Sequence, residues 1–149
     1  DEQFIREQNL KLTGLDQLLQ KSDFISIHVP LTHETRNLIG QEQFEMMKPT
    51  AFLINTARGA VIDENALYRA LRSGKIAGAA LDVLIEEPPK DRRLMELENV
   101  IITPHISPFT KEALENAEKL SAQNIIDVLE GNPPPYVINK EVLKRRDKA

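Results

Sequence analysis

The chain contains no cysteine and no tryptophan, and aromatic residues make up only 5% of its 149 residues. Without cysteine, disulfide bonds and thiolate metal sites are excluded. The three histidines, at 28, 33 and 105, lack the spacing of zinc ligands, so no metal is expected. No apolar run is long enough to span a membrane, and the acidic, polar start is unlike a signal peptide. We therefore expect a cytoplasmic protein.

Positive charge is also in short supply. The chain has 19 Lys and Arg against 23 Asp and Glu, which gives a formal net charge of −4. This balance argues against nucleic acid or an anionic membrane as the main partner. A hydrophobic content of 41% over this length fits one folded domain with a core.

Apolar runs and helical patterns alternate along the chain, which is typical of an α/β fold with a parallel sheet. Asp63 and Thr110 are predicted helix caps, and Gly74 and Gly131 are predicted helix stops. Strands are expected at 10–12, 24–29, 51–54, 76–82 and 100–105. Helices are expected at 1–9 (helical or frayed), 15–20, 41–47, 64–73 and 111–130.

Reactive side chains follow three of the predicted strands. Arg58 comes after the strand at 51–54, Asp82 and then Glu87 close the next one, and His105 closes the last. Because the carboxyl ends of parallel strands meet at one edge of a sheet, where ligands bind, these side chains are expected to gather there.

Each of these side chains also has an ordinary structural interpretation. Arg58 could be a surface charge, and His105 could be a simple loop residue. Asp82 could cap a turn, and the adjacent Glu86 and Glu87 could be solvated charges beside a proline-rich turn. Spacing alone leaves these alternatives open.

Four sequence motifs match those of a known family in their residues and in their order along the chain. They are HVPLTHETRNLIG at 28–40, MMKPTAFLINTARGAVIDENAL at 46–67, GAALDVLIEEPP at 78–89 and TPH at 103–105. In these motifs the chain resembles the D-isomer-specific 2-hydroxyacid dehydrogenases, over about residues 10 to 143. The motifs EEPPKDR and ENVIITPH look most like the phosphoglycerate and hydroxypyruvate branch.

The resemblance implies a catalytic set of Arg58, Glu87 and His105. An Arg can grip the carboxylate of a 2-keto acid with two hydrogen bonds and polarise the keto oxygen. His105 would donate the proton, and Glu87 would orient the imidazole and favour its charged form. Family spacing selects Glu87 rather than Glu86 as the partner of His105. Formate dehydrogenases have Gln at this position, so the Glu found here disfavours formate dehydrogenase activity.

The resemblance also implies a nicotinamide cofactor, NAD with NADP not excluded. Asp82 would accept a hydrogen bond from the nicotinamide carboxamide, whereas His33 is expected to be a plain exposed loop residue. The cofactor-binding residues implied are His28, Val29, Pro30, Thr56, Ala57, Arg58, Asp82, His105 and Ser107.

Two departures from the family pattern stand out. The small residue pair that usually follows the catalytic His is replaced by Ile106-Ser107, and the bulky Phe109 comes after Pro108, so substrate access or nicotinamide placement is expected to differ. No GxGxxG turn occurs in these residues. The predicted fold is therefore the second half of a Rossmann-type doubly wound sheet, lacking the first βαβ unit.

We accordingly expect residues 1–131 to be a partial NAD(P)-binding domain and 132–149 to be a C-terminal extension. The tail, with Lys144-Arg145-Arg146, would return to a missing substrate domain or end in solvent. The complete enzyme, expected to be a homodimer, would transfer a hydride between the cofactor and a small D-2-hydroxy or 2-keto acid. This chain alone is expected to be inactive. The alternative is a non-catalytic fragment or a corepressor-type binding module, because such corepressors retain the same residues.

Overall fold

The structure is a computed structural model that describes residues 2–139. The chain divides into two compact units, with the boundary between Ile106 and Ser107. Helix α1 (Glu2–Glu7) opens the first unit, which also holds all four strands, and the second unit holds helix α5.

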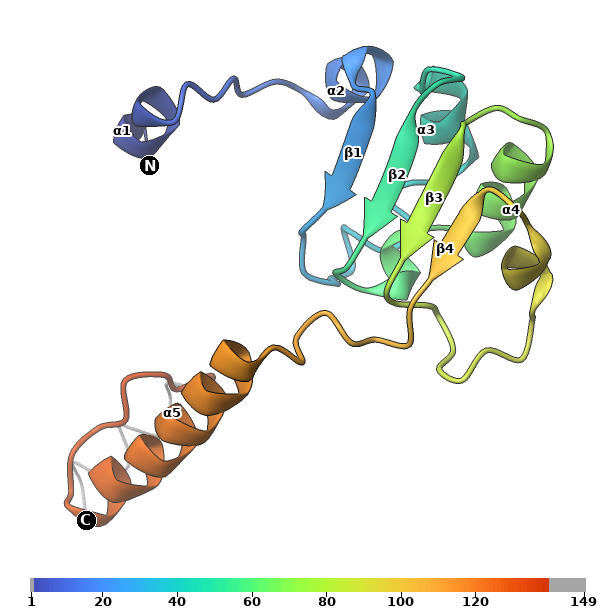
Figure 1. The fold of residues 1–149 in the computed structure, drawn as a ribbon. Coiled ribbons are helices and arrows are strands. Elements are labelled where there is room, and N and C mark those ends of the chain that lie inside the picture. Colours follow the sequence, from blue (N-terminus) through green and yellow to red (C-terminus); the bar gives the residue numbers. More distant parts are fainter. Residues whose placement is uncertain (1, 140–149) are drawn as a thin grey trace. The chain divides into compact units, whose positions relative to one another are not determined.

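The first unit is built on a parallel sheet in which the strands lie in chain order, β1-β2-β3-β4. Figure 1 shows the four arrows side by side and pointing in the same direction. Their bounds are Phe24–Ile27, Phe52–Asn55, Gly78–Leu81 and Val100–Ile102. The parallel α/β fold predicted from the sequence is confirmed.

Helices cover one face of this sheet. They are α2 (Leu15–Lys21), α3 (Gln41–Met46) and α4 (Glu64–Arg72), and α3 packs against both of the others. In β1 the buried residues are Ile25 and Ile27, while Phe24 is exposed and stacks on Phe52 of the next strand. This alternation follows from the two-residue period of a strand.

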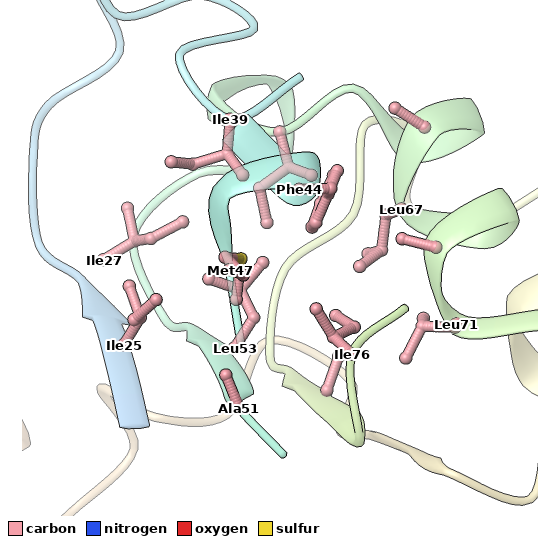
Figure 2. Close-up of a cluster of buried hydrophobic side chains, with 14 of the residues drawn as sticks. Ile25, Ile27, Ile39, Phe44, Met47, Ala51, Leu53, Leu67, Leu71 and Ile76 are labelled. Atoms are coloured by element: carbon pink, nitrogen blue, oxygen red, sulfur yellow. The ribbon is translucent and has the colours of Figure 1, made fainter. Parts of the chain in front are cut away.

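The core lies between the covered face and the helices. Figure 2 shows Ile25 and Leu53 of the sheet facing Phe44 of α3, with Leu67 of α4 in the same cluster. Both Phe44 and Leu67 are fully buried. Truncating such a leucine to alanine typically lowers the free energy of unfolding by about 2–5 kcal/mol. The packing of this cluster therefore holds the strands, and with them the strand ends, in place.

Helix α4 begins and ends where the sequence predicts. The Asp63 side chain accepts hydrogen bonds from the backbone N–H groups of Asn65 and Ala66. Gly74 has a φ of 69°, a left-handed conformation that glycine adopts without a steric penalty. The apolar stripe of the helix is buried against the core. The cap and the buried stripe together fix the position of the N-terminus of α4, which lies next to the candidate site.

The second unit contains helix α5 (Lys111–Leu129). Thr110 accepts a hydrogen bond from Ala113 N–H as the predicted cap, and Gly131 follows the helix with a φ of 87°. None of the α5 residues is buried. Of the predicted extension 132–149, the structure describes 132–139, and the predicted course of 140–149, with its basic cluster, lies outside the described residues.

One strand prediction is wrong. Residues 10–12 form no strand, and Leu10 and Leu12 are exposed. The remaining four strands form: the one predicted at 51–54 is shifted by one residue, and the other three are shorter than predicted because the ends of their apolar runs leave the sheet. Within residues 2–139, no helix is both long and apolar enough to cross a membrane.

Candidate active site

The loop that follows β2 is shaped by a buried amide side chain. Asn55 is fully buried, and its Oδ1 accepts from Ala57 N–H at 3.0 Å. Its Nδ2 donates to the carbonyl oxygen of Arg58, also at 3.0 Å. Both ends of the amide are thus bonded to the turn, as a buried polar group requires. The turn leaves Arg58 exposed, with Nη1 donating to the Ala57 carbonyl at 2.6 Å.

Gly59 brings this loop against the loop after β3. A Cβ atom at Gly59 would overlap the peptide that joins Leu84 to Ile85, so no other residue fits without a shift of the backbone. Arg58 therefore belongs to a loop that touches the segment leading to Glu87. The two loops come from neighbouring strands, β2 and β3, which pair in parallel.

Asp82 is a buried carboxylate directly after β3, with 6% of its surface exposed. Its Oδ1 accepts hydrogen bonds from the Thr103 hydroxyl and, at 2.9 Å, from Ile106 N–H. These two residues flank His105 in sequence. Asp82 therefore links the end of β3 to the turn that carries the histidine, which agrees with a turn-capping role and leaves its predicted cofactor role untested.

The backbone of His105 is held in an unusual conformation. Its φ is 53°, in the left-handed region that few residues other than glycine adopt. His105 N–H donates to the carbonyl oxygens of Asp82 at 2.9 Å and Thr103 at 3.0 Å. Together with the bonds to the Asp82 side chain, these contacts fix where the imidazole projects from the end of β4.

The imidazole meets a carboxylate from the neighbouring loop. His105 Nδ1 lies 2.7 Å from Glu87 Oε2, and both side chains are about 40% exposed (40% and 39%). The other oxygen of Glu87, Oε1, accepts from Leu84 N–H at 3.0 Å. The hydrogen bonds to His105 and to Leu84 N–H lower the pKa of Glu87 below its ordinary value, so the carboxylate is charged at neutral pH.

The neighbouring Glu86 is positioned differently. Its Oε1 pairs with Lys90 at 3.2 Å on the surface. The structure thus places Glu87, the residue that family spacing selects, against the imidazole.

A pocket of about 360 Å³ lies beside this pair. Its wall is mostly apolar and includes Met95 and Ile102, with Glu87, His105 and Asp82 supplying the polar groups. An apolar wall with a few convergent polar groups is typical of a small-molecule site. Among the described residues, no cluster of His, Asp and Glu has the geometry of a metal site.

The other predicted cofactor residues are placed as follows. His28 is exposed after β1, and its Nε2 lies 2.8 Å from Ser26 Oγ. The carbonyl of Pro30 accepts from the Thr35 hydroxyl at 2.6 Å, Val29 is half-buried and Thr56 is exposed. Ser107 belongs to the second unit. Hydrogen bonds thus join His105 to both Asp82 and Glu87, and Gly59 packs the Arg58 loop against the segment that leads to Glu87.

Three residues that shape the site are not predicted from the sequence. Asn55, Thr103 and Glu64 all bond to site loops, Glu64 through Ile85 N–H at 2.6 Å. A polar residue at the end of an apolar strand was the available signal for Asn55 and Thr103. Glu64 gave no signal, because an acidic residue in the first turn of a helix is common for electrostatic reasons alone.

Comparison with known proteins identifies the family. The model of the "D-isomer specific 2-hydroxyacid dehydrogenase, NAD binding domain" matches residues 1–107. The chain belongs to this family of D-2-hydroxyacid dehydrogenases. The resemblance inferred from the sequence motifs is thereby confirmed.

Curated relatives in this dehydrogenase family include two archaeal enzymes named glyoxylate reductase. The one from Thermofilum pendens is 54% identical over 139 residues, which is 93% of this chain and 41% of the relative. The one from Pyrococcus horikoshii is 48% identical, over 97% of this chain and 43% of the relative. The chain therefore spans less than half the length of these relatives.

Solved structures of dehydrogenases share the fold. D-lactate dehydrogenase with NAD⁺ from Lactobacillus jensenii matches with a TM-score of 0.84 and 37% identity, over 89% of this chain and 44% of that chain. The holo form of D-mandelate dehydrogenase from Rhodotorula graminis matches with a TM-score of 0.88 and 35% identity, over 94% and 41% of the respective chains. The chain thus carries part of an NAD-binding Rossmann-type domain.

Proposed function

We propose that the protein carrying this chain is an NAD-dependent oxidoreductase that transfers a hydride between the nicotinamide and a D-2-hydroxy or 2-keto acid. The observation that carries this proposal is the hydrogen-bonded pair of Glu87 and His105, held at the carboxyl edge of a parallel sheet next to the Arg58 loop. Ligands of open α/β sheets bind at this edge.

His105 is the proposed proton donor. Reduction of a keto group requires a proton at the carbonyl oxygen, and imidazole is the side chain that titrates nearest neutral pH. Because Glu87 engages Nδ1, the ring would donate from Nε2. A charged carboxylate on the far nitrogen stabilises the imidazolium and orients the ring, so Glu87 and His105 would act as one acid.

Arg58 is the proposed carboxylate receptor. Its guanidinium is always charged and offers a planar fork that matches two oxygen atoms of a carboxylate. It is exposed and projects from a turn that Asn55 fixes by two hydrogen bonds. A 2-keto acid held by this fork would present its keto oxygen to the same guanidinium and to His105.

The residues at the sheet edge fit the nicotinamide end of the cofactor. When bound, the cofactor would supply the hydride. The buried Asp82 carboxylate and the exposed Thr56 hydroxyl offer an acceptor and a polar contact at the ends of β3 and β2. The residues predicted to hold the cofactor, including His28, Val29, Pro30, Ala57 and Ser107, are part of this proposal, and a comparison of NADH with NADPH tests the use of NADP.

The names of the relatives favour a small 2-keto acid as substrate. Those reported above are named glyoxylate reductase, D-lactate dehydrogenase and D-mandelate dehydrogenase, and the acids in these names share the carboxylate beside the reacting carbon. A homodimer, a cytoplasmic location and a domain boundary at residue 131 stay predictions from the sequence. So does the inactivity of these 149 residues by themselves.

The direct test is reduction of glyoxylate, hydroxypyruvate and pyruvate by NADH and by NADPH, using the polypeptide of native length. We expect saturable reduction of at least one acid, and a loss of most of it in His105→Gln. NADH binding without reduction of any of the three acids would favour the corepressor-type alternative, which retains the same residues.

A further inference from the structure

The segment from Leu84 to Glu87 is bonded from two directions by consecutive backbone N–H groups. Leu84 N–H donates to Oε1 of Glu87, within the segment itself. Ile85 N–H donates to Oε1 of Glu64 at 2.6 Å, from outside it. Glu64 is the first residue of α4 and lies 21 positions earlier in the chain. A side chain of the helix is therefore bonded to the loop that carries the proposed partner of His105.

The position of Glu64 is well defined by its own helix. The preceding residue, Asp63, caps α4, and Ala66 and Leu67 bury the first turn against the core. The carboxylate of Glu64 thus projects from a rigid element toward a loop without regular secondary structure. In such a pair, the helix positions the loop.

The charged side chains near Glu64 disfavour an ionised carboxylate at this position. Asp91 and Glu86 lie near enough to repel it, and burial removes part of its hydration. Burial is the main reason that the pKa of Glu64 is raised, with repulsion by Asp91 and Glu86 adding to the effect. The nearby Arg93 pairs with Asp91 through Nη2 at 2.6 Å and also donates to Asn65. Two favourable interactions remain, the dipole at the N-terminus of α4 and the hydrogen bond to Ile85 N–H, and only the second connects Glu64 to the loop.

Gly59 approaches the same peptide. Its Cα packs so closely on the Leu84–Ile85 peptide that a Cβ would overlap it. The peptide is thus in contact with both the Arg58 loop and the Glu64 carboxylate. Any shift of this peptide moves Leu84 N–H, which is bonded to Glu87, and so moves the carboxylate that meets His105.

We propose that Glu64 is a positioning residue for the acid pair, acting through Ile85 N–H and the Leu84 peptide to hold Glu87 on His105. This inference rests on the proposed function for its effect on turnover, but its geometric part is independent of it. Glu64 touches neither substrate nor cofactor in this account. What the role requires is a hydrogen-bond acceptor at this position, and an amide oxygen meets that requirement as well as a carboxylate.

The test compares three variants of the native-length polypeptide. Glu64→Met keeps the length and helix propensity of the side chain but removes the acceptor. Glu64→Gln keeps an acceptor oxygen and removes the charge. Glu42→Met, at an exposed acidic position in the first turn of α3, is the matched control. Readouts are kcat and KM for the keto acid, the pH profile, and hydrogen exchange of the Ile85 amide.

We expect Glu64→Met to lower kcat by about tenfold to 100-fold with little change in KM, since a misplacement of about 1 Å at a site has effects of this size. The pH at which reduction declines should become lower, because the imidazolium form of His105 loses its contact with the Glu87 carboxylate. Glu64→Gln and Glu42→Met should stay within threefold of wild type. A purely structural role would lower the free energy of unfolding of Glu64→Met and leave its pH profile in place, which would overturn the proposal.

Hydrogen exchange tests the contact without any variant. The Ile85 amide should be protected in the wild-type protein, and exchange at the rate of an unprotected amide would overturn the proposal even if Glu64→Met failed to fold. If the wild type reduces no keto acid, the proposed function fails separately. NMR of the His105 ring nitrogens in wild type and Glu64→Met would then still decide the positioning role, which requires the Nδ1 signature of the hydrogen bond to Glu87 to be lost in the variant.

Discussion

Nδ1 of His105 lies 2.7 Å from Oε2 of Glu87, although the two residues are 18 positions apart and follow different strands. Neither side chain is buried, so the pair depends on the loops that carry it rather than on a closed pocket. Those loops are held by Asp82 on the histidine side and by Leu84 N–H on the glutamate side.

Replacing Arg58 by lysine should lower the activity of the native-length protein by about 100-fold. A point-charge ammonium cannot hold the carboxylate and the keto oxygen together as a planar guanidinium can, and a single misplaced contact has an effect of this order. Steady-state kinetics with a 2-keto acid measure it. Rates within threefold of wild type would remove Arg58 from the site.

Gly59→Ala should destabilise the protein and impair the site together. The added Cβ overlaps the Leu84–Ile85 peptide, and overpacking of this kind costs about 1–3 kcal/mol. Chemical denaturation measures the loss of stability. Gly14→Ala is the control, because a Cβ there meets no atom within 4 Å. Gly14 is the N-cap of α2 and makes no side-chain hydrogen bond, so its replacement should lower stability only slightly. Equal stabilities and activities for the two variants would contradict the close approach.

Thr103→Val should lower the free energy of unfolding by about 1–3 kcal/mol, the usual cost of removing the donor from a buried acceptor. The variant keeps the shape of the side chain but removes the hydroxyl that donates to the buried Asp82 carboxylate. Urea denaturation at neutral pH is the measurement. An unchanged midpoint would mean that Asp82 does not rely on this donor.

Glu64 should make the stability of the protein depend on pH. Its pKa is raised in the folded state, mainly by burial, so between the ordinary glutamate pKa and the raised value the folded state binds more protons than the unfolded state. The free energy of unfolding therefore falls as pH rises through this interval. Glu64→Gln should remove this contribution, and denaturation curves of both proteins from mildly acidic to neutral pH check it. Identical pH dependence would contradict the raised pKa.

The order of strands and helices could be predicted because the signals are local. Asp63 and Thr110 are predicted and observed as caps, since a capping side chain reaches only two or three residues along the chain. Residues 10–12 have the composition of a strand but pair with no strand in the described part of the chain. Local pattern cannot supply the neighbour that a strand requires.

The site was predictable only in part, for a similar reason. Strand ends pointed to Arg58, Asp82 and His105, because parallel topology brings carboxyl ends together. Nothing in the composition separates Glu87 from Glu86, and it was the family resemblance that selected the former. The link from Glu64 to Ile85 depends on how α4 packs against a loop, which only the three-dimensional structure shows.

The decisive measurement is the pH profile of keto-acid reduction in Glu87→Gln, because it shows whether Glu87 and His105 act as one acid. If Glu87 and His105 act as one acid, removing the carboxylate destabilises the imidazolium, and reduction requires the imidazolium. In the native-length protein, activity should therefore decline at lower pH in the variant than in wild type, with a reduced maximum. A profile that coincides with that of wild type would mean that Glu87 is only a turn residue and that the two residues do not act as one acid.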